Sequence, residues 1–344
     1  MSKTAKIWLI IAGSLTALGI LIFVGAMAMC NWSFSNFGNA KYTTKTYEVN
    51  ELFDNISIDV PSCDINFVLS KNGQCKVDCY DTEKAEYSAT VKDKTLTVTT
   101  SDEDSSWTDR LSSFSLESPK MTVYLPENEY KQLSITTATG DVNLPADFSF
   151  DGVDVDCSTS DVDCSASAVK DMKIHSTTGD VNLSSLSADN VDISVTTGDV
   201  ALEGIKTKGD LSVKTTSGDI SLTDTISEKS FSLEGVTCDV IFDKCDAAQI
   251  TATTTTGDIT GTLRSDKSFT ATSSSGDVDI PNPCEGGKCE LTANTGDINI
   301  RIDNSETAES KTENTETAKN TTEKSKTEKN TTEKSKTDNV KKDK

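Results

Sequence analysis

The chain has 344 residues, with 33 Lys plus Arg against 55 Asp plus Glu, and its formal net charge is −22. Phosphate backbones repel such an acidic chain, which excludes nucleic acid as a partner. The one histidine, His175, excludes zinc sites built on paired histidines and leaves a single imidazole for acid–base chemistry. Apolar residues make up 35% of the chain, below the roughly 45–50% of an ordinary globular protein.

The first thirty residues predict a membrane anchor. Residues 7–29 carry no formal charge, and about 20 apolar residues in one helix can cross a bilayer. Lys3 and Lys6 precede them and favour a cytoplasmic N-terminus. We therefore expect a single-pass protein of the cell membrane, with an anchor over 1–30, a linker over 31–41 and an extracytoplasmic remainder. A signal peptide cleaved after Ala28 and a lipoprotein signal at Cys30 are the alternatives.

Residues 42–130 have the pattern of antiparallel β-structure. Turn signals such as Lys71-Asn72-Gly73 separate the expected strands. The strands are expected at 53–60, 64–69, 76–80, 87–91, 95–100 and 120–125. A repeat region follows, and its end would expose strand edges unless something covers them. We therefore interpret 42–130 as the lead-in and cap of that region.

A short motif of the form Thr-Gly-Asp-Val recurs across residues 131–302. Successive aspartates of the motif lie 19 or 20 residues apart. Recurrence at a fixed interval is typical of stacked repeats. The aspartates are Asp141, Asp161, Asp180, Asp199, Asp219, Asp239, Asp258, Asp277 and Asp297.

Alignment of the copies on the aspartate identifies the buried face. The residue directly after the aspartate is β-branched in every copy, from Val142 to Ile298. Apolar residues also predominate three positions after the aspartate and six and eight positions before it. This spacing is typical of strands with one buried face. Because so short a repeat buries a core only by stacking, we predict an all-β fold, a single-stranded parallel β-solenoid of about nine coils of 19–20 residues.

From residue 303 to the end the chain consists mostly of Lys, Glu, Thr, Ser and Asn. The segment KNTTEKSKTE at 319–328 is followed by a near copy at 329–338. This composition cannot bury enough apolar surface to offset the entropy cost of ordering the chain. We expect a disordered tail over 303–344.

The repeats resemble a bacterial family known as putative adhesins, a domain of unknown function marked by Thr-Thr-Gly-Asp-Val repeats. The resemblance covers roughly residues 42–302, including the lead-in NELFDNISIDV. It implies a β-helical fold, often with an N-terminal membrane anchor, and no particular activity. Ser160 and Cys238 stand where the other copies have a glycine before the aspartate, so the resemblance leaves the geometry of those two corners open.

The aspartate column is the first candidate site. Carboxylates about 4.8 Å apart repel one another, and bound Ca²⁺ would relieve the repulsion. The candidate calcium ligands are Asp141, Asp180, Asp199, Asp219, Asp258, Asp277 and Asp297. The pattern lacks further ligands, and an aspartate beside glycine can accept hydrogen bonds from turn amides. We therefore interpret the column as structural and predict no cofactor.

The ten cysteines are the second candidate. Cys157 and Cys164 occupy inward positions that face each other across one corner, and they are the best candidates for a disulfide. Cys284 and Cys289 flank a loop that contains glycine, and they rank second. Buried free thiols are the alternative for every pair.

Catalysis has little support in the sequence. His175 falls at an outward position, and the spacing identifies no Ser-His-Asp set. Acidic pairs can hydrolyse polysaccharides, but the prominent aspartates already belong to the repeat. We therefore predict a non-enzymatic, adhesin-like interaction or scaffold module of a bacterial cell envelope, with a protein or glycan partner. The alternatives are an envelope-stress sensor of the same fold and a polysaccharide-acting enzyme.

Overall fold

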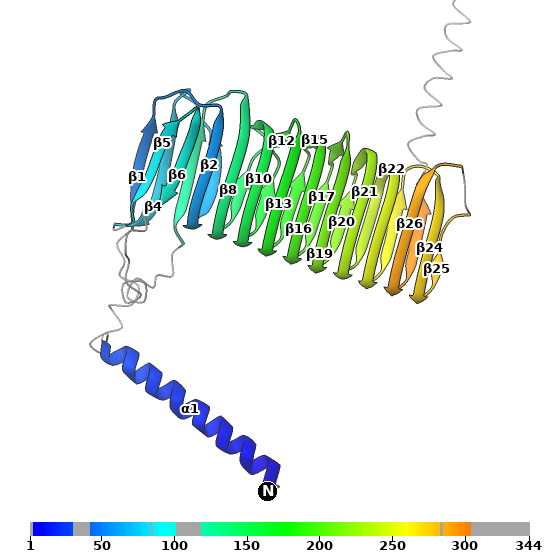
Figure 1. Ribbon diagram of the computed structural model, residues 1–344, viewed down its shortest axis with the longest axis horizontal. Coiled ribbons are helices and arrows are strands. Elements are labelled where there is room, and N and C mark those ends of the chain that lie inside the picture. Colours follow the sequence, from blue (N-terminus) through cyan, green and yellow to red (C-terminus); the bar gives the residue numbers. More distant parts are fainter. Residues whose placement is uncertain (1–2, 30–41, 84, 101–117, 283–284, 304–344) are drawn as a thin grey trace, which may run out of the picture. The chain divides into compact units, whose positions relative to one another are not determined.

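The computed structural model describes residues 3–29, 42–83, 85–100, 118–282 and 285–303 (Figure 1). Within them it has one helix, α1 (Lys3–Met29), and strands β1 to β27. The chain divides into two compact units, residues 1–201 and residues 202–344. The expected linker over 31–41 and the expected tail beyond residue 303 lie outside the described residues.

The prediction of a membrane anchor is wrong. A membrane-spanning helix needs about 20 apolar residues in one run. Among the described residues, no helix has both the length and the apolar character that crossing a bilayer requires. This finding overturns the anchor over residues 7–29, the membrane as a partner and the single-pass localisation derived from them.

The first unit stacks coils in which a long strand precedes the aspartate corner and a short strand follows it. We call the layer of long strands sheet B and the layer of short strands sheet A. Sheet B contains β2 (Asn55–Ser62), β8 (Tyr130–Thr139), β10 (Ser149–Thr159), β13 (Asp171–Thr178) and β16 (Asn190–Thr197), all parallel. Sheet A contains β3 (Asp64–Leu69), β9 (Val142–Leu144), β11 (Val162–Cys164) and β14 (Val181–Ser184), also parallel. Two-residue strands, β12 (Ser167–Ala168) and β15 (Ser187–Ala188), lie between corners, and β17 (Val200–Glu203) falls at the boundary of the units.

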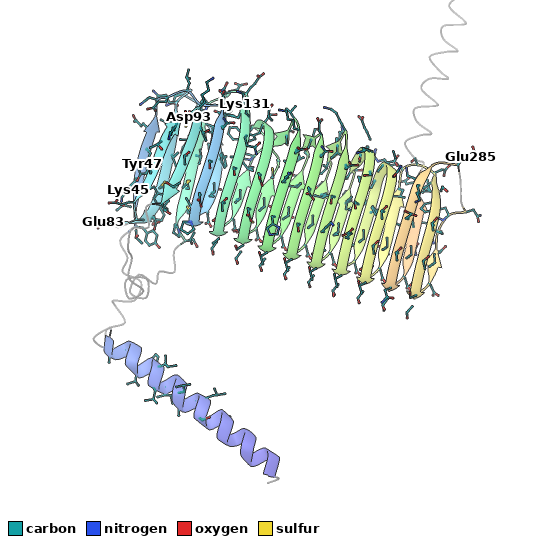
Figure 2. The ribbon with its side chains drawn as sticks, viewed as in Figure 1. Lys45, Tyr47, Glu83, Asp93, Lys131 and Glu285 are labelled. Atoms are coloured by element: carbon teal, nitrogen blue, oxygen red, sulfur yellow. The ribbon has the colours of Figure 1, made fainter. Side chains whose placement is uncertain are left out.

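Antiparallel strands cover the N-terminal end of this stack. They are β1 (Tyr42–Val49), β4 (Cys75–Thr82) and β5 (Tyr87–Lys92), with β1 on β4, β4 on β7 (Lys120–Leu125) and β5 on β6 (Thr95–Thr100). β6 and β7 themselves pair in parallel with β2 and β3 and add one more coil. Lys45 on β1 donates to the carbonyls of Glu83 and Ala85 at 3.2 and 2.6 Å, which holds the β4–β5 connection against the cap (Figure 2). The lead-in therefore combines the expected antiparallel pairs with an additional parallel coil.

The second unit repeats the same coil, but its last two coils are stacked in reverse order. Its strands are β18 (Lys206–Thr207), β19 (Asp210–Ser217), β20 (Ile220–Thr223), β21 (Ile226–Thr237), β22 (Val240–Thr256), β23 (Ile259–Leu263), β24 (Lys267–Ser275), β25 (Val278–Asp279), β26 (Gly287–Thr295) and β27 (Ile298–Ile302). β26 pairs with β22 on one side and β24 on the other, and β27 likewise lies between β23 and β25. The final coil of the sequence is thus inserted beneath the coil that precedes it, as Figure 1 shows.

The predicted inward columns form the core of each unit. Val181 and Leu183 on β14 are buried while Asn182 between them is exposed, and on β20 Ile220 and Leu222 are buried on either side of the half-buried Ser221. The described strands therefore confirm the predicted β-solenoid, which has about eight turns.

Candidate functional site

The aspartates form a ladder of hydrogen bonds along the corner. In the first unit the backbone N–H of Asp180 donates to Oδ1 of Asp161 at 2.8 Å, and that of Asp199 donates to Oδ1 of Asp180 at 2.8 Å. The ladder begins at Asp64, whose Oδ1 accepts from the N–H of Asp141 at 3.3 Å. The remaining rungs are Asp161 to Asp141 and, in the second unit, Asp239 to Asp219, Asp258 to Asp239, Asp297 to Asp258 and Asp277 to Asp297. The carboxylates that accept in these rungs therefore fix the turns of the fold.

The geometry of the corner explains why glycine precedes most of these aspartates. Gly179 has a φ of +130°, and a Cβ on it would lie 2.0 Å from the carbonyl oxygen of Ser160. Ser160 and Cys238 do not have the positive φ of the corner glycines. Their side chains turn inward and are buried. Cys238 has the room because Gly235 lies beneath it, where a Cβ would come within 2.4 Å of the Cβ of Cys238. In the sequence, Cys238 replaces the usual corner glycine and Gly235 replaces a larger residue three positions earlier. The two changes together indicate that the cysteine side chain occupies the space above Gly235.

The ladder does not form a metal cage in the described residues. There, no three His, Cys, Asp or Glu side chains are grouped so as to hold a metal ion. The seven calcium candidates are the ladder residues themselves, and in each described rung one carboxylate oxygen is used by a neighbouring N–H. That the column is structural, with calcium as the alternative, stays a prediction that titration can test.

The cysteines that the structure describes carry free thiols, and all eight are buried. Cys157 Sγ lies 3.4 Å from the carbonyl oxygen of His175, and Cys164 Sγ lies 3.6 Å from that of Ala166. The predicted Cys157–Cys164 bond is thus not formed in the structure. Burial raises the pKa of Cys164 and of Cys289 to about 12. Cys284, the other half of the second predicted pair, lies outside the described residues.

One row of side chains brings together residues that spacing alone did not identify. Asp156 on β10, His175 on β13 and Ser194 on β16 are in register on three adjacent strands of sheet B. In the described part of the chain, no hydrogen bond joins these three side chains, and the hollow described next does not include them. A nucleophilic serine requires a histidine within hydrogen-bond reach and a donor for the developing oxyanion. The row therefore has the residue types of a triad without its contacts.

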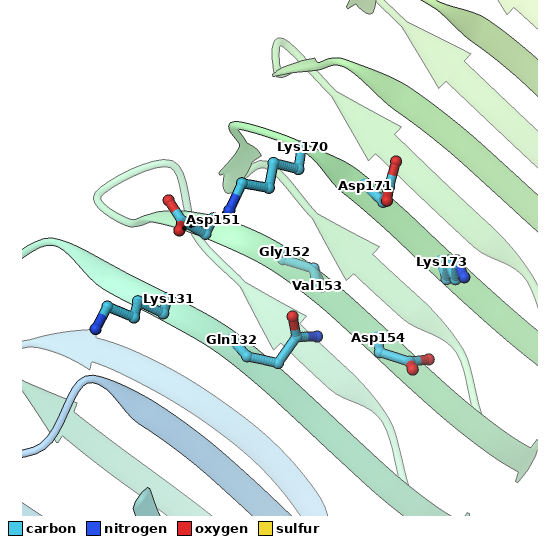
Figure 3. Close-up of a pocket in the computed structure, with 9 residues that line it drawn as sticks. All are labelled: Lys131, Gln132, Asp151, Gly152, Val153, Asp154, Lys170, Asp171 and Lys173. Carbon is cyan, nitrogen blue, oxygen red and sulfur yellow. Dashed lines mark hydrogen bonds and ion pairs between the residues drawn. The ribbon is translucent and has the colours of Figure 1, made fainter. Parts of the chain in front are cut away.

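The outer face of sheet B has a hollow of about 430 Å³ in the first unit, lined by residues of β8, β10 and β13 and the turn before β13 (Figure 3). Gly152 lies at its centre, in register with Gln132, in a row that elsewhere on these strands carries Gln132, Asp171 and Asn190. A Cβ on Gly152 would lie 2.6 Å from Oε1 of Gln132. The missing side chain therefore opens the row, and we call this hollow the Gly152 notch. Its lining residues are Lys131, Gln132, Asp151, Gly152, Val153, Asp154, Lys170, Asp171 and Lys173.

Several polar groups of the Gly152 notch are already engaged. Lys170 pairs with Asp151 at 3.1 Å, and Asn190 donates to Oδ1 of Asp171 at 2.8 Å. Lys131 pairs with Asp54 at 2.8 Å, and its side-chain hydrogen bond lowers the pKa of the Asp54 carboxyl.

Other groups in the notch remain open. Asp154 and Lys173 are neighbours in register, and in the described residues neither makes a hydrogen bond or an ion pair. Together with the amide oxygen of Gln132, they present one anionic acceptor, one cationic donor and one neutral acceptor toward solvent.

Comparison with known proteins adds the family. A putative adhesin from Bacteroides fragilis NCTC 9343 is 16% identical over 76% of this chain and 97% of its own, with a TM-score of 0.43. A putative adhesin from Parabacteroides distasonis ATCC 8503 is 13% identical over 76% and 98%, with a TM-score of 0.45. A putative lipid binding protein from the same organism is 14% identical over 77% and 98%, with a TM-score of 0.43. The search of curated proteins gave no match. The model of the Toastrack DUF4097 family matches residues 53–268 and 210–343, and since these cover most of the chain, the protein belongs to that family.

Proposed function

We propose that this protein is a non-catalytic, adhesin-like interaction module whose ligand contacts the outer face of sheet B at the Gly152 notch. The observation that carries the proposal is the missing side chain at Gly152, which opens a hollow of about 430 Å³ in a row filled on both sides. A hollow of that volume is in the range of small-ligand sites. The absence of side-chain contacts within the row Asp156, His175 and Ser194 favours binding over catalysis.

The chemistry of the open groups favours a hydroxyl-rich, uncharged ligand such as one unit of a glycan. Asp154 offers an acceptor for sugar hydroxyls, Lys173 offers a donor, and Gln132 offers an amide oxygen. The lining carries three lysines and three aspartates, so the notch presents little net charge for an ionic ligand. A neutral polyol satisfies the three open groups without leaving a charge unbalanced.

The experiment is binding of the labelled full chain to an array of uncharged oligosaccharides, followed by titration with the strongest binder. Gly152→Asn fills the notch with the side chain that Asn190 already places in the same row. The clash of its Cβ is only with the flexible end of Gln132, so we expect the fold to persist. We expect affinity to fall at least about tenfold, which is the loss of about 1.4 kcal/mol.

A matched control is Gln249→Asn, an exposed substitution at the same position of the repeat in the second unit. It should leave glycan affinity unchanged. The proposal fails if no neutral oligosaccharide binds, or if Gly152→Asn binds as tightly as the unaltered chain. Capture of a protein that Gly152→Asn still binds would assign the interaction to another surface.

A further inference from the structure

We infer that β24 is a self-association edge, through which two copies of this chain pair strand to strand. β24 hydrogen-bonds to β26 along one side. Among the described residues, no strand pairs with its other side, so nine residues from Lys267 to Ser275 form the rim of sheet B. A free rim of this kind is a template for another strand.

The coil that carries this edge is also the least well covered in the core. Val278 is 42% exposed, whereas Ile298, the corresponding residue one layer inward, is 0% exposed. The two residues are in register on β25 and β27. Val278 and the partly exposed Ile280 therefore present the inward face of an end coil on which no described strand is stacked.

Features that normally protect an edge are present elsewhere but missing from β24. β1, the outer strand of sheet A in the first unit, carries Lys45 and Glu48. β25 is two residues long and is followed closely by Pro281. Short strands, charges and proline all discourage pairing at an edge. The outward side chains of β24 are uncharged and are Ser268, Thr270, Thr272 and Ser274.

The charged residue of β24, Lys267, does not protect the edge by charge repulsion. Lys267 has only 4% of its side chain exposed, and its Nζ contacts Oδ1 of Asp246 at 2.5 Å, the carbonyl of Ala247 at 2.7 Å and Oγ of Ser265 at 2.8 Å. Because these contacts hold its ammonium inside its own chain, Lys267 does not repel a second copy at the edge.

A second copy is the occupant that fits this edge. A two-fold axis makes the two β24 strands antiparallel, and with the axis at Ala271 each Thr270 lies opposite a Thr272 and each Ser268 opposite a Ser274. Such a contact is self-complementary, as closed dimers require. It places no like charges opposite one another, which matters for a chain of net charge −22. The chain's own residues 304–344 suit the edge poorly, since Val340 is their one large apolar residue.

The test is sedimentation of the full chain at several concentrations and physiological ionic strength. We expect a concentration-dependent dimer. The double substitution Thr270→Lys and Thr272→Lys places lysines directly opposite one another across the axis, and it should weaken dimerisation at least about tenfold.

The control is Thr251→Lys with Thr253→Lys on β22. β26 pairs Glu290 with both Thr251 and Thr270, and Thr292 with both Thr253 and Thr272, so the control adds the same charges to the same rows on a strand that is paired on both sides. It should leave the dimer intact. Circular dichroism checks that both variants are folded. A monomer at every concentration, or equal dimerisation of the two variants, would overturn the inference.

Discussion

Burial changes from one residue to the next along β14. Val181 is 0% exposed and lies in register with the equally buried Val162 of β11, while the amide of Asn182 points outward and donates to Oδ1 of Asp163 at 3.0 Å. The column after the aspartate has one chemical requirement, a β-branched side chain that fills the space between the two sheets. Its neighbour is constrained only by the row of polar side chains on the outer face.

The first prediction compares these neighbours. Val181→Asp buries an unpaired carboxylate, and we expect it to cost several kcal/mol of unfolding free energy or to prevent folding. Asn182→Asp replaces one exposed hydrogen bond with solvent-screened repulsion from Asp163, and it should cost about 1–2 kcal/mol. Thermal melts of the two variants measure the difference. Equal melting temperatures would mean that the inward and outward faces are assigned the wrong way round.

The second prediction separates hydrogen bonding from charge in the aspartate ladder. Asp180→Asn keeps an acceptor for the N–H of Asp199 and removes one of the mutually repelling charges, so its stability should be equal to or slightly above that of the unaltered chain. Asp180→Ala leaves that N–H without its partner, and we expect a loss of about 1–3 kcal/mol.

Denaturant unfolding of both variants, with and without millimolar Ca²⁺, measures these effects. Calcium should shift both alike, as matched ionic strength does. A saturable, calcium-selective stabilisation that Asp180→Asn abolishes would make the ladder a metal site.

The insertion of β26 between β22 and β24 depends on how closely backbones can approach. A Cβ on Gly287 would lie 2.0 Å from the carbonyl oxygen of Ala248, and one on Gly286 would lie 2.0 Å from that of Asp266. Gly286 directly precedes β26 and Gly287 is its first residue, so the chain enters the stack at two positions that have no side chains. The end coils of the second unit can exchange order because every coil presents the same columns to its neighbours.

The third prediction follows from that contact. Gly287→Ala pushes a methyl group into a backbone carbonyl, and we expect a loss of about 1–3 kcal/mol or more. Gly152→Ala is the control, because its methyl meets only the flexible end of Gln132 and the substitution should be neutral or mildly stabilising. Hydrogen exchange of the β26 amides measures the local effect. Equal protection in the two variants would mean that the Gly287 contact does not limit insertion.

In both units, the sequence predicts the features that recur in every coil. It does not predict the features that depend on how the coils are arranged in space. The nine aspartates and their flanking columns are enough to predict the coils, because burial there depends on local alternation. The reversed order of the last two coils could not be predicted, since Asp277 and Asp297 have the same spacing as the other copies. The aspartate alignment identifies the inward columns and leaves the outward rows unspecified, so it does not reveal the Gly152 notch. The alignment of Asp156, His175 and Ser194 in one row depends on register, which a single sequence gives only after the coils are stacked.

The last prediction concerns the buried thiols, which occur in both units. Burial raises the pKa of Cys75, Cys79 and Cys164 to about 12 and that of Cys245 to about 11. In the unfolded chain a thiol ionises near pH 8.5. Because the folded pKa is the higher one, this contribution to stability is complete below about pH 8.5 and is lost as the pH rises toward 11–12.

We therefore expect the melting temperature to fall steeply between about pH 9 and pH 11, with each thiol contributing up to about 1.4 kcal/mol per pH unit. Replacing Cys164 by Ala removes one such group, so the slope should become shallower by about one proton while stability at pH 7 falls for loss of packing. Cys30→Ala, at a position outside the described residues, controls for the loss of a thiol as such. A thiol titration of the unfolded, unreduced chain completes the test, because a Cys157–Cys164 disulfide would remove two thiols from the count. In that case Cys157→Ala would release the Cys164 thiol, and the alkaline slope would become steeper by about one proton instead of shallower.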